Sequence, residues 1–504
     1  MPTLSGGLRD LIEHDQKAAR PLLIDLVARL PKSTEARVLL ANSYLRSLEV
    51  APALEHYRAA FALDPKSLPI LHQMGLCAIA MGDYEGALAT YRQAFSIAPE
   101  AHPAAMAALL LHRLGRLGEA VKAYGDLIAK LKPDSPEAPH VFRGAAMLLR
   151  DAGAPLAAER SLHDLLGLYR RNPVGVASAL IERDNSIDFH EWTRYAHKTD
   201  LARALTRHAQ RHPGAIAFPA TFVLPEDRGA LIDYAARESS ALFIAKPHRG
   251  TGGQGMAIAS HVRDMIERDD VVVQRYVDRP ALVDGRKGHV RLYGLVASLA
   301  PFRAYLYGDG IVRFAPEPYD ASEQGLANVH SHVTNTALHL GHPMLEVSDD
   351  PAKENSGAVW SLRAYFERLR ADGRDVDRLW ADLRALTSGF LAMVAADGLF
   401  ERQAKAAPRR SFPPKLFGLD VLIDADGKPW LIEAQRKPAM SGSALVKRIN
   451  AQMFRTIFEM SCGYAFDDAL GGEQITRLAK DRGALLGREA ELEIARRRLF
   501  VSLT

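Results

Sequence analysis

The chain has few cysteines and little excess charge, and both scarcities narrow the classes of protein to consider. Its 504 residues include two cysteines, Cys77 and Cys462, which offer neither a disulfide framework nor a metal motif. The 64 basic and 60 acidic residues leave a net charge of +4, without the basic excess of a nucleic-acid-binding domain. There is no basic-then-apolar signal pattern at the N-terminus, and no apolar run approaches a membrane span. We expect a cytoplasmic protein that binds neither nucleic acid nor membrane.

Residues 417–435 have the pattern of a β-hairpin. Two alternating apolar runs flank a turn near Asp426, where Gly427 supplies the positive φ that a tight turn needs. Apolar residues of the first run share one face, which leaves Asp420 on the other. Glu433 and Gln435 are two residues apart and share a face, and the turn places Glu433 opposite Asp420 to within about a residue.

This pairing predicts a metal site. Two unpaired carboxylates side by side would repel and raise each other's pKa, so a hard cation better explains the arrangement. Oxygen ligands favour Mg²⁺ or Mn²⁺ over Zn²⁺. The predicted ligands are Asp420, Glu433 and Gln435.

A glycine-rich loop follows an apolar strand predicted over residues 241–247. The strand ends near Lys246, and the loop contains Gly250, Gly253 and Gly255. Glycines at this density let backbone N–H groups approach a polyphosphate, and the lysine adds a positive charge. The loop is not a Walker A loop, because Met256 and not Lys-Ser/Thr follows Gly255, and Gly250 to Gly255 does not keep the Rossmann spacing. A carboxylate pair together with a phosphate loop indicates a nucleotide enzyme.

Eight motifs in this order resemble the tubulin-tyrosine-ligase-like branch of the ATP-grasp superfamily over roughly residues 198–463. They span residues 218–225, 244–247, 250–255, 272–277, 285–291, 305–314, 332–335 and 417–435. The resemblance implies an enzyme that uses ATP to phosphorylate a carboxylate, after which an amine attacks the acyl phosphate to give an amide. ATP and either Mg²⁺ or Mn²⁺ are the implied cofactors.

The resemblance also assigns nucleotide contacts. Lys246 and Lys287 would contact phosphates, and the strand end at Gln274, Tyr276 and Val277 would face adenine. An ordinary buried strand with Tyr276 in the core is the alternative for that segment.

Two arginines and a Thr-Asn pair match the substrate side of the site. By the same resemblance, Arg291 meets the transferred phosphoryl group, and Arg313, placed after a hairpin turn at residues 308–310, binds the carboxylate substrate or γ-phosphate. Thr334 and Asn335 would place the substrate end. Each arginine could instead be half of an ordinary ion pair.

The chain departs from the family at two positions. The family usually has Asn where this chain has Gln435, and Asp at the nucleotide-binding position of His289. Gln435 moves the amide oxygen by one methylene, and an imidazole replaces an acceptor. His330 and His332 share a face of a predicted strand, and structural histidines explain them better than zinc does.

The N-terminal third is a repeat array. Ala53, Tyr57 and Phe61 recur as Ala87, Tyr91 and Phe95, each displaced by 34 residues. This is the tetratricopeptide (TPR) period, in which small residues let helices approach and aromatics fill the gap between them. We interpret the tyrosines, including Tyr124, as packing residues. Such solenoids usually bind a peptide or protein on a concave face.

The predicted fold is therefore a multidomain chain: an all-α TPR solenoid, an α+β ATP-grasp domain and a helical C-terminal tail. The predicted boundaries are 1–171 for the solenoid, 172–197 for a connecting segment, 198–465 for the ligase domain and 466–504 for the tail. The favoured function is ligation of an amino acid co-substrate to a protein or peptide recruited by the TPR array. The alternative is a nucleotide-binding TPR scaffold with weak or no activity.

Overall fold

The computed structural model describes most of the chain. The described residues are 16–152 without 48, 133 and 134, scattered positions between 161 and 176, and 190–248, 253, 255–299, 301–348, 350–406, 415–436, 442–461, 491 and 500–503. The chain divides into two compact units. One comprises residues 1–190, 405–412 and 458–496, and the other comprises residues 191–404, 413–457 and 497–504.

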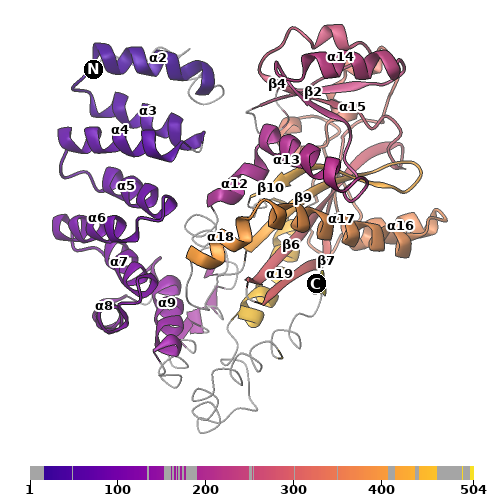
Figure 1. The fold of residues 1–504 in the computed structure, drawn as a ribbon. Coiled ribbons are helices and arrows are strands. Elements are labelled where there is room, and N and C mark those ends of the chain that lie inside the picture. The colour runs from indigo at the N-terminus through magenta and orange to yellow at the C-terminus, as the bar shows by residue number, and fades with distance from the viewer. Residues whose placement is uncertain are drawn as a thin grey trace. The chain divides into compact units, whose positions relative to one another are not determined.

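The first unit is a stack of helices, drawn in indigo to purple in Figure 1. Its described helices are α2 Gln16–Arg29, α3 Thr34–Arg46, α4 Val50–Leu63, α5 Leu68–Ala80, α6 Tyr84–Ile97, α7 Ala101–Arg113, α8 Leu117–Lys130 and α9 Ala138–Asp151. Each of these helices packs against the next one along the chain, as the repeat pattern predicts. The predicted helical repeats are confirmed for this part of the chain.

The repeated tyrosines fill the spaces between these helices. Tyr57, Tyr91 and Tyr124 are buried, which confirms their interpretation as packing residues. The rings of Tyr91 and Tyr124 need glycine opposite them: a Cβ on Gly75 would lie 2.6 Å from the ring of Tyr91, and one on Gly144 would lie 2.2 Å from the Tyr124 hydroxyl. The close approach of helices therefore depends on large and small residues in register.

The second unit contains two antiparallel sheets. The smaller sheet has the order β1-β4-β2-β3, and the larger has the order β10-β9-β6-β7-β11, with β5 paired to β6 and β8 to β7. The strands are β1 Thr221–Val223, β2 Phe243–Pro247, β3 Ala257–Ala259, β4 Val271–Arg275, β5 Leu282–Val283, β6 Arg286–Leu299, β7 Phe302–Phe314, β8 Val359–Ser361, β9 Lys415–Ile423, β10 Pro429–Gln435 and β11 Phe500–Ser502.

Helices cover these sheets. The α-helices are α12 Thr193–Ala196, α13 Lys198–Arg211, α14 Arg228–Arg237, α15 Val329–His332, α16 Leu362–Ala371, α17 Val376–Ala396, α18 Leu399–Ala406 and α19 Ala444–Ser461. The 3₁₀ turns are η1 His190–Trp192, η2 Val262–Asp264, η3 Gly325–Ala327 and η4 Thr336–His339. Phe222, Leu231 and Phe243 belong to the core of the smaller sheet, and α14 supplies Leu231.

One helix of this unit has the length and composition of a membrane span. Among the described residues, helix α17 meets this criterion, whereas the sequence analysis expects no apolar run close to the length of a membrane span. Its apolar residues, including Leu383, Phe390 and Val394, are buried within the unit, and it contacts β10 and α13. A core helix passes the same test of length and composition, and this packing accounts for the apolar composition of α17.

The predicted hairpin at residues 417–435 is confirmed. Asp420 pairs with Glu433, and Gly427 takes a φ of 84° in the turn. The register depends on a bulge at Ile432, which lies between the Leu431–Val421 and Glu433–Asp420 pairs. Strand β9 is buried along its whole length because it lies between β10 and β6.

Three local predictions are wrong. Residues 308–310 form no hairpin turn but lie inside β7, where the pairing with β6 shifts register between Leu292–Gly310 and Gly294–Leu306. His330 and His332 belong to the short helix α15 and not to a strand. The tail was predicted to be helical through Phe500, yet Phe500 begins β11 and pairs with Tyr307. Cys462 lies outside the described residues.

Candidate active site

Lys246 lies near the end of β2, and its side chain belongs to a polar network of the smaller sheet. Its Nζ donates to Gln274 Oε1 at 2.7 Å, and Gln274 Nε2 donates to Thr221 Oγ1 at 2.9 Å. All three residues lie on paired strands, β2, β4 and β1, so the sheet register sets the network. Burial lowers the pKa of Lys246 to about 8. A bound polyphosphate would stabilise the charged form of this lysine.

Lys287 occupies a matching position in the larger sheet. The turn between β5 and β6 is made by Asp284 and Gly285, both at positive φ, as a two-residue hairpin requires. Lys287 Nζ then donates to the Tyr276 hydroxyl at 2.7 Å and lies 4.2 Å from the centre of its ring. Burial and the charge of Lys246 lower the pKa of Lys287 to about 7.

Tyr276 is buried, as the core alternative expected, yet its hydroxyl is part of the polar site. Its hydroxyl lies 2.8 Å from His332 Nδ1, and His332 Nε2 lies 3.1 Å from the carbonyl oxygen of Gly325. Because only Nε2–H can donate to that carbonyl, Nδ1 accepts from Tyr276. This supports a structural histidine at 332. The sequence analysis did not identify Thr221 and His332 as residues that position the site, although both lie within motifs that carry the family resemblance.

Arg291 and Asp420 form a buried ion pair across β6 and β9. The two residues are direct partners in the strand register. Arg291 Nη2 donates to Asp420 Oδ2 at 2.8 Å, and Nε donates to Oδ1 in a second, short contact. Gln435 Nε2 also approaches Oδ2, at 3.4 Å. Burial alone would raise the pKa of Asp420, but the Arg291 charge and hydrogen bonds lower it to about 2.

This ion pair corrects the argument for the metal site. The sequence argument assumes unpaired carboxylates in the hairpin, whereas Arg291 compensates the charge of Asp420 in the folded chain. The inference from mutual repulsion to a cation therefore fails. The three predicted ligands still come together, because Glu433 lies opposite Asp420 and Gln435 contacts it. Within the described residues, no group of three His, Cys, Asp or Glu side chains is placed to hold a metal ion.

His289 and Arg313 carry buried polar atoms without partners. They are neighbours in the β6–β7 register. His289 Nδ1 lies 2.5 Å from Thr334 Oγ1, but its Nε2 has no hydrogen bond, and neither does Arg313 Nη1. Burial lowers the pKa of His289 to about 3, and burial and Arg291 lower the pKa of Arg313. Buried polar atoms without partners are rare in native proteins, so a ligand is the expected partner for these two.

The glycine loop approaches the Thr-Asn segment. Gly253 and Gly255 have φ values of 87° and 71°, and a Cβ on Gly253 would lie 2.9 Å from Val333. Gly253 thus allows close packing as well as a left-handed backbone. Gly250 lies outside the described residues. The Asn335 side chain caps η4 by accepting from Ala337 N at 3.1 Å, and Val277 is half-buried just after β4.

These residues fit a nucleotide with a divalent cation. Lys246, Lys287 and Arg291 are buried and Arg313 is close to them, whereas the carboxylates at hand are Asp420 and Glu433. A polyphosphate would neutralise this positive surplus and accept from Arg313 Nη1. Asp420, Glu433 and Gln435 offer oxygen atoms of the type that Mg²⁺ prefers.

Two antiparallel sheets holding such a set of side chains define the ATP-grasp class of ligase domains. The particular family follows from comparison: the model of the tubulin-tyrosine ligase family matches residues 182–468, more than half of the chain. The chain belongs to the tubulin-tyrosine ligase family. Residues 13–94 match the model of anaphase-promoting complex, cyclosome, subunit 3, in keeping with the helical repeats.

Similar curated proteins carry the names of tubulin-modifying enzymes. A probable beta-tubulin polyglutamylase of Tetrahymena thermophila is 30% identical over 254 residues, which are 49% of this chain and 21% of that protein. Tubulin polyglutamylase TTLL5 of Homo sapiens is 32% identical over 48% of this chain and 19% of its own length. Tubulin polyglutamylase ttll-4 of Caenorhabditis elegans is 26% identical over 57% of this chain and 49% of its own length. The chain thus spans between a fifth and a half of these relatives.

Proposed function

We propose that the protein is an ATP- and Mg²⁺-dependent ligase that joins an amino acid to a carboxylate of a protein or peptide. The observation that carries the proposal is the buried basic set, Lys246, Lys287 and Arg291, beside the orphaned Arg313 Nη1. A site without an anion would have no use for this much desolvated positive charge. Glutamate is the proposed amino acid, because the relatives are named as glutamylases.

The proposed reaction has two steps. A carboxylate oxygen of the acceptor takes the γ-phosphoryl group of ATP and releases ADP. The amine nitrogen then attacks the acyl carbon, phosphate leaves, and the amine loses a proton. Lys246 and Lys287 would bind phosphate oxygens, and Arg291 would stabilise the charge that spreads during phosphoryl transfer. The bound cation would neutralise phosphate charge, held by Asp420, Glu433 and Gln435.

The TPR array is proposed to recruit the acceptor. Helical repeats of this kind commonly present a concave face to a peptide. The relatives act on tubulin by name. The acceptor proposed here is defined only by its chemistry: a protein or peptide with an accessible carboxylate.

The test is transfer of labelled glutamate. The full chain is incubated with ATP, Mg²⁺, isotope-labelled glutamate and a cell lysate, and acceptor proteins are read by mass spectrometry. We expect glutamyl mass increments that need both ATP and a divalent cation. Glu433→Gln should lose them, because a carboxylate carries most of the attraction for the cation, and Gln435→Asn should keep them. Label that appears without ATP would contradict a ligase.

A nucleotide-binding scaffold is the second candidate. The Arg291–Asp420 ion pair favours it, because a carboxylate held by arginine is less available to a cation. Binding of ATP without hydrolysis and without labelling of any lysate protein would favour the scaffold over the ligase.

A further inference from the structure

His289 is one of the two positions at which the chain departs from the family, and the structure shows the surroundings of its side chain. It lies on β6, two residues from Arg291, and it is 8% exposed. Its Nε2 is buried without a hydrogen bond and lies 3.8 Å from Asp420 Oδ1. This separation is too long for a hydrogen bond, so the buried nitrogen and the carboxylate face each other without a bond between them.

The other ring nitrogen fixes the orientation of His289. Nδ1 lies 2.5 Å from Thr334 Oγ1, and this contact holds the ring in place through the nitrogen that does not face Asp420. When Nδ1–H donates to that hydroxyl, Nε2 carries a lone pair directed at the site. Metal-ligating histidines are typically held in this way through their second nitrogen.

An ion pair with Asp420 is a poor alternative explanation. A buried ion pair would bring Nε2 within hydrogen-bonding distance of the carboxylate, whereas the separation from Asp420 Oδ1 is 3.8 Å. A neutral imidazole with a free lone pair is the form that binds metals. It also lacks the positive charge that would otherwise repel a divalent cation.

We propose that His289 Nε2 is a nitrogen ligand of the cation that Asp420 binds, and that it shifts the preference of the site from Mg²⁺ toward Mn²⁺. Metal bonds of about 2.1 Å from each atom can span up to about 4.2 Å, so one ion can bridge the 3.8 Å separation. This inference rests on the proposed function, because it concerns the cation of the same nucleotide site.

Asp420 can take part while it stays near Arg291. A carboxylate offers about four lone-pair directions, and the arginine fork uses two of them. Oxygen atoms of Gln435, nucleotide or water would complete the ion's surroundings. Imidazole binds first-row transition ions well, whereas Mg²⁺ keeps to oxygen ligands, and from this difference we derive the shift in preference.

The direct test is pulsed electron paramagnetic resonance of bound Mn²⁺. The full chain is prepared with ¹⁵N-labelled histidine and loaded with Mn²⁺ and a non-hydrolysable ATP analogue that contains only ¹⁴N. We expect hyperfine coupling from a directly bound ¹⁵N, which separates His289 from nitrogen atoms of the nucleotide. His289→Asp should lose the ¹⁵N coupling and still bind the Mn²⁺ nucleotide.

The control is His261→Gln, at an exposed position just before η2. It should keep the ¹⁵N coupling. A second measurement is the ratio of nucleotide affinities with Mn²⁺ and with Mg²⁺, from calorimetry. That ratio should fall by roughly tenfold or more in His289→Asp and stay unchanged in the control.

The outcomes separate this inference from the proposed function. Wild-type protein that binds the Mn²⁺ nucleotide with oxygen ligands only would overturn the nitrogen ligand and leave the ligase standing. Nitrogen coupling together with failure of glutamate transfer would retain the ligand and contradict the ligase. Absence of nucleotide binding with either cation would overturn both.

Discussion

Arg291 has one partner in the folded chain and a second in the proposed reaction. Its guanidinium holds the buried carboxylate of Asp420, and the transferred phosphoryl group would compete for the same donors. Because both residues are buried, removing the arginine would leave an uncompensated charge in the core. A variant at this position therefore tests stability and catalysis together, and the two must be measured separately.

We expect Arg291→Lys to fold and lose activity. The lysine keeps the charge beside Asp420 but lacks the fork of donors that stabilises a phosphoryl group. Product formation should fall by roughly 100-fold, while ATP affinity changes by less than about tenfold. Arg291→Gln should lose roughly 3–5 kcal/mol of unfolding free energy in denaturant titrations. Equal losses of ATP affinity and turnover in the lysine variant would instead identify a ground-state nucleotide contact.

The lowered pKa of Lys246 predicts that the protein takes up protons when it binds the nucleotide. Burial lowers the pKa of Lys246 to about 8, so above that pH the free protein holds it largely neutral. A polyphosphate favours the charged form and raises this pKa, so binding should take up protons and weaken as pH rises above 8. Calorimetry at pH 8.5, in buffers with different ionisation enthalpies, measures the uptake. Lys246→Met should reduce the uptake and leave the part that comes from Lys287, whose pKa of about 7 a polyphosphate would raise in the same way. An unchanged value would assign the titration to another group.

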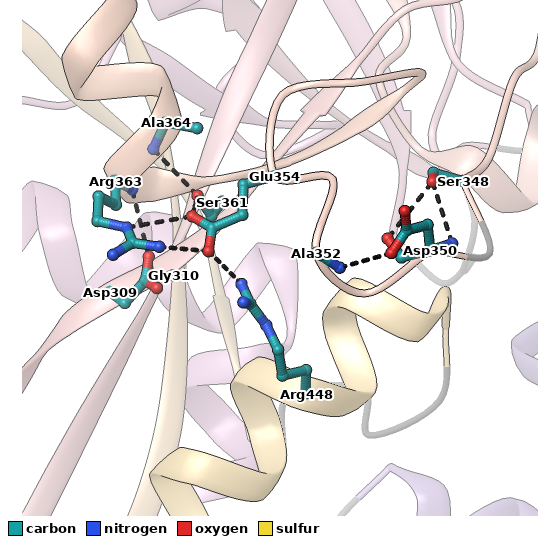
Figure 2. Close-up of polar contacts among 10 residues, drawn as sticks. All are labelled: Asp309, Gly310, Ser348, Asp350, Ala352, Glu354, Ser361, Arg363, Ala364 and Arg448. Carbon is teal, nitrogen blue, oxygen red and sulfur yellow. Dashed lines mark hydrogen bonds and ion pairs between the residues drawn. The ribbon is translucent and has the colours of Figure 1, made fainter.

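At the scale of elements, the partly buried carboxylate of Glu354 connects a loop to two helices. Figure 2 shows Glu354 between Arg363 of α16 and Arg448 of α19. Ser361 Oγ donates to Glu354 Oε2 at 2.8 Å and also caps α16 by accepting from Ala364 N. Burial would raise the pKa of Glu354, but these hydrogen bonds outweigh it and lower the pKa to about 2. The cluster holds the segment before β8 against the larger sheet's helices.

This cluster gives a stability prediction with a defined pH window. Because the folded pKa of Glu354 lies below its unfolded value, the stabilisation is present above about pH 4.3 and is lost as pH falls toward 2. At pH 7, Glu354→Gln should cost roughly 2–4 kcal/mol of unfolding free energy. The difference from wild type should shrink below pH 4, in denaturant titrations at several pH values. A difference independent of pH would point to lost packing.

The packing of the repeat helices predicts that two glycine substitutions differ in their effect on the free energy of unfolding. Gly75→Ala would bring a Cβ to 2.6 Å from the Tyr91 ring, so it should cost about 1–3 kcal/mol. Gly125→Ala, inside α8 with nothing within 4 Å of its Cβ, should be neutral or stabilise by about 0.5–1 kcal/mol. Thermal unfolding followed by circular dichroism compares the two. Equal effects would refute the tight fit between Gly75 and Tyr91.

At the scale of the whole molecule, the repeat unit and the ligase unit have separate cores. All predicted nucleotide residues lie after residue 198, and the family match begins at residue 182. A chain that begins at residue 182 should fold and bind ATP within about threefold of the full chain. Its KM for a protein acceptor should rise, because the proposed recruiting repeats are gone. A truncated chain that folds, by circular dichroism, but binds no ATP would refute this separation.

Local patterns by themselves determined the repeats and the hairpin. The 34-residue displacement identified helices whose tyrosines and alanines pack as expected. Alternation of apolar residues around Gly427 predicted that Asp420 faces Glu433, and the register agrees. These features depend on contacts within one repeat or one turn, where spacing along the chain sets geometry.

Only the tertiary structure decided which charges compensate one another. Arg291 and Asp420 are 129 residues apart and meet because β6 pairs with β9, a register that local pattern does not encode. The bulge at Ile432, the continuation of β7 through residues 308–310 and the pairing of Phe500 with Tyr307 also depend on neighbouring strands. Sequence spacing sets the face on which a side chain lies, but its burial, partner and pKa depend on what the rest of the fold brings against that face.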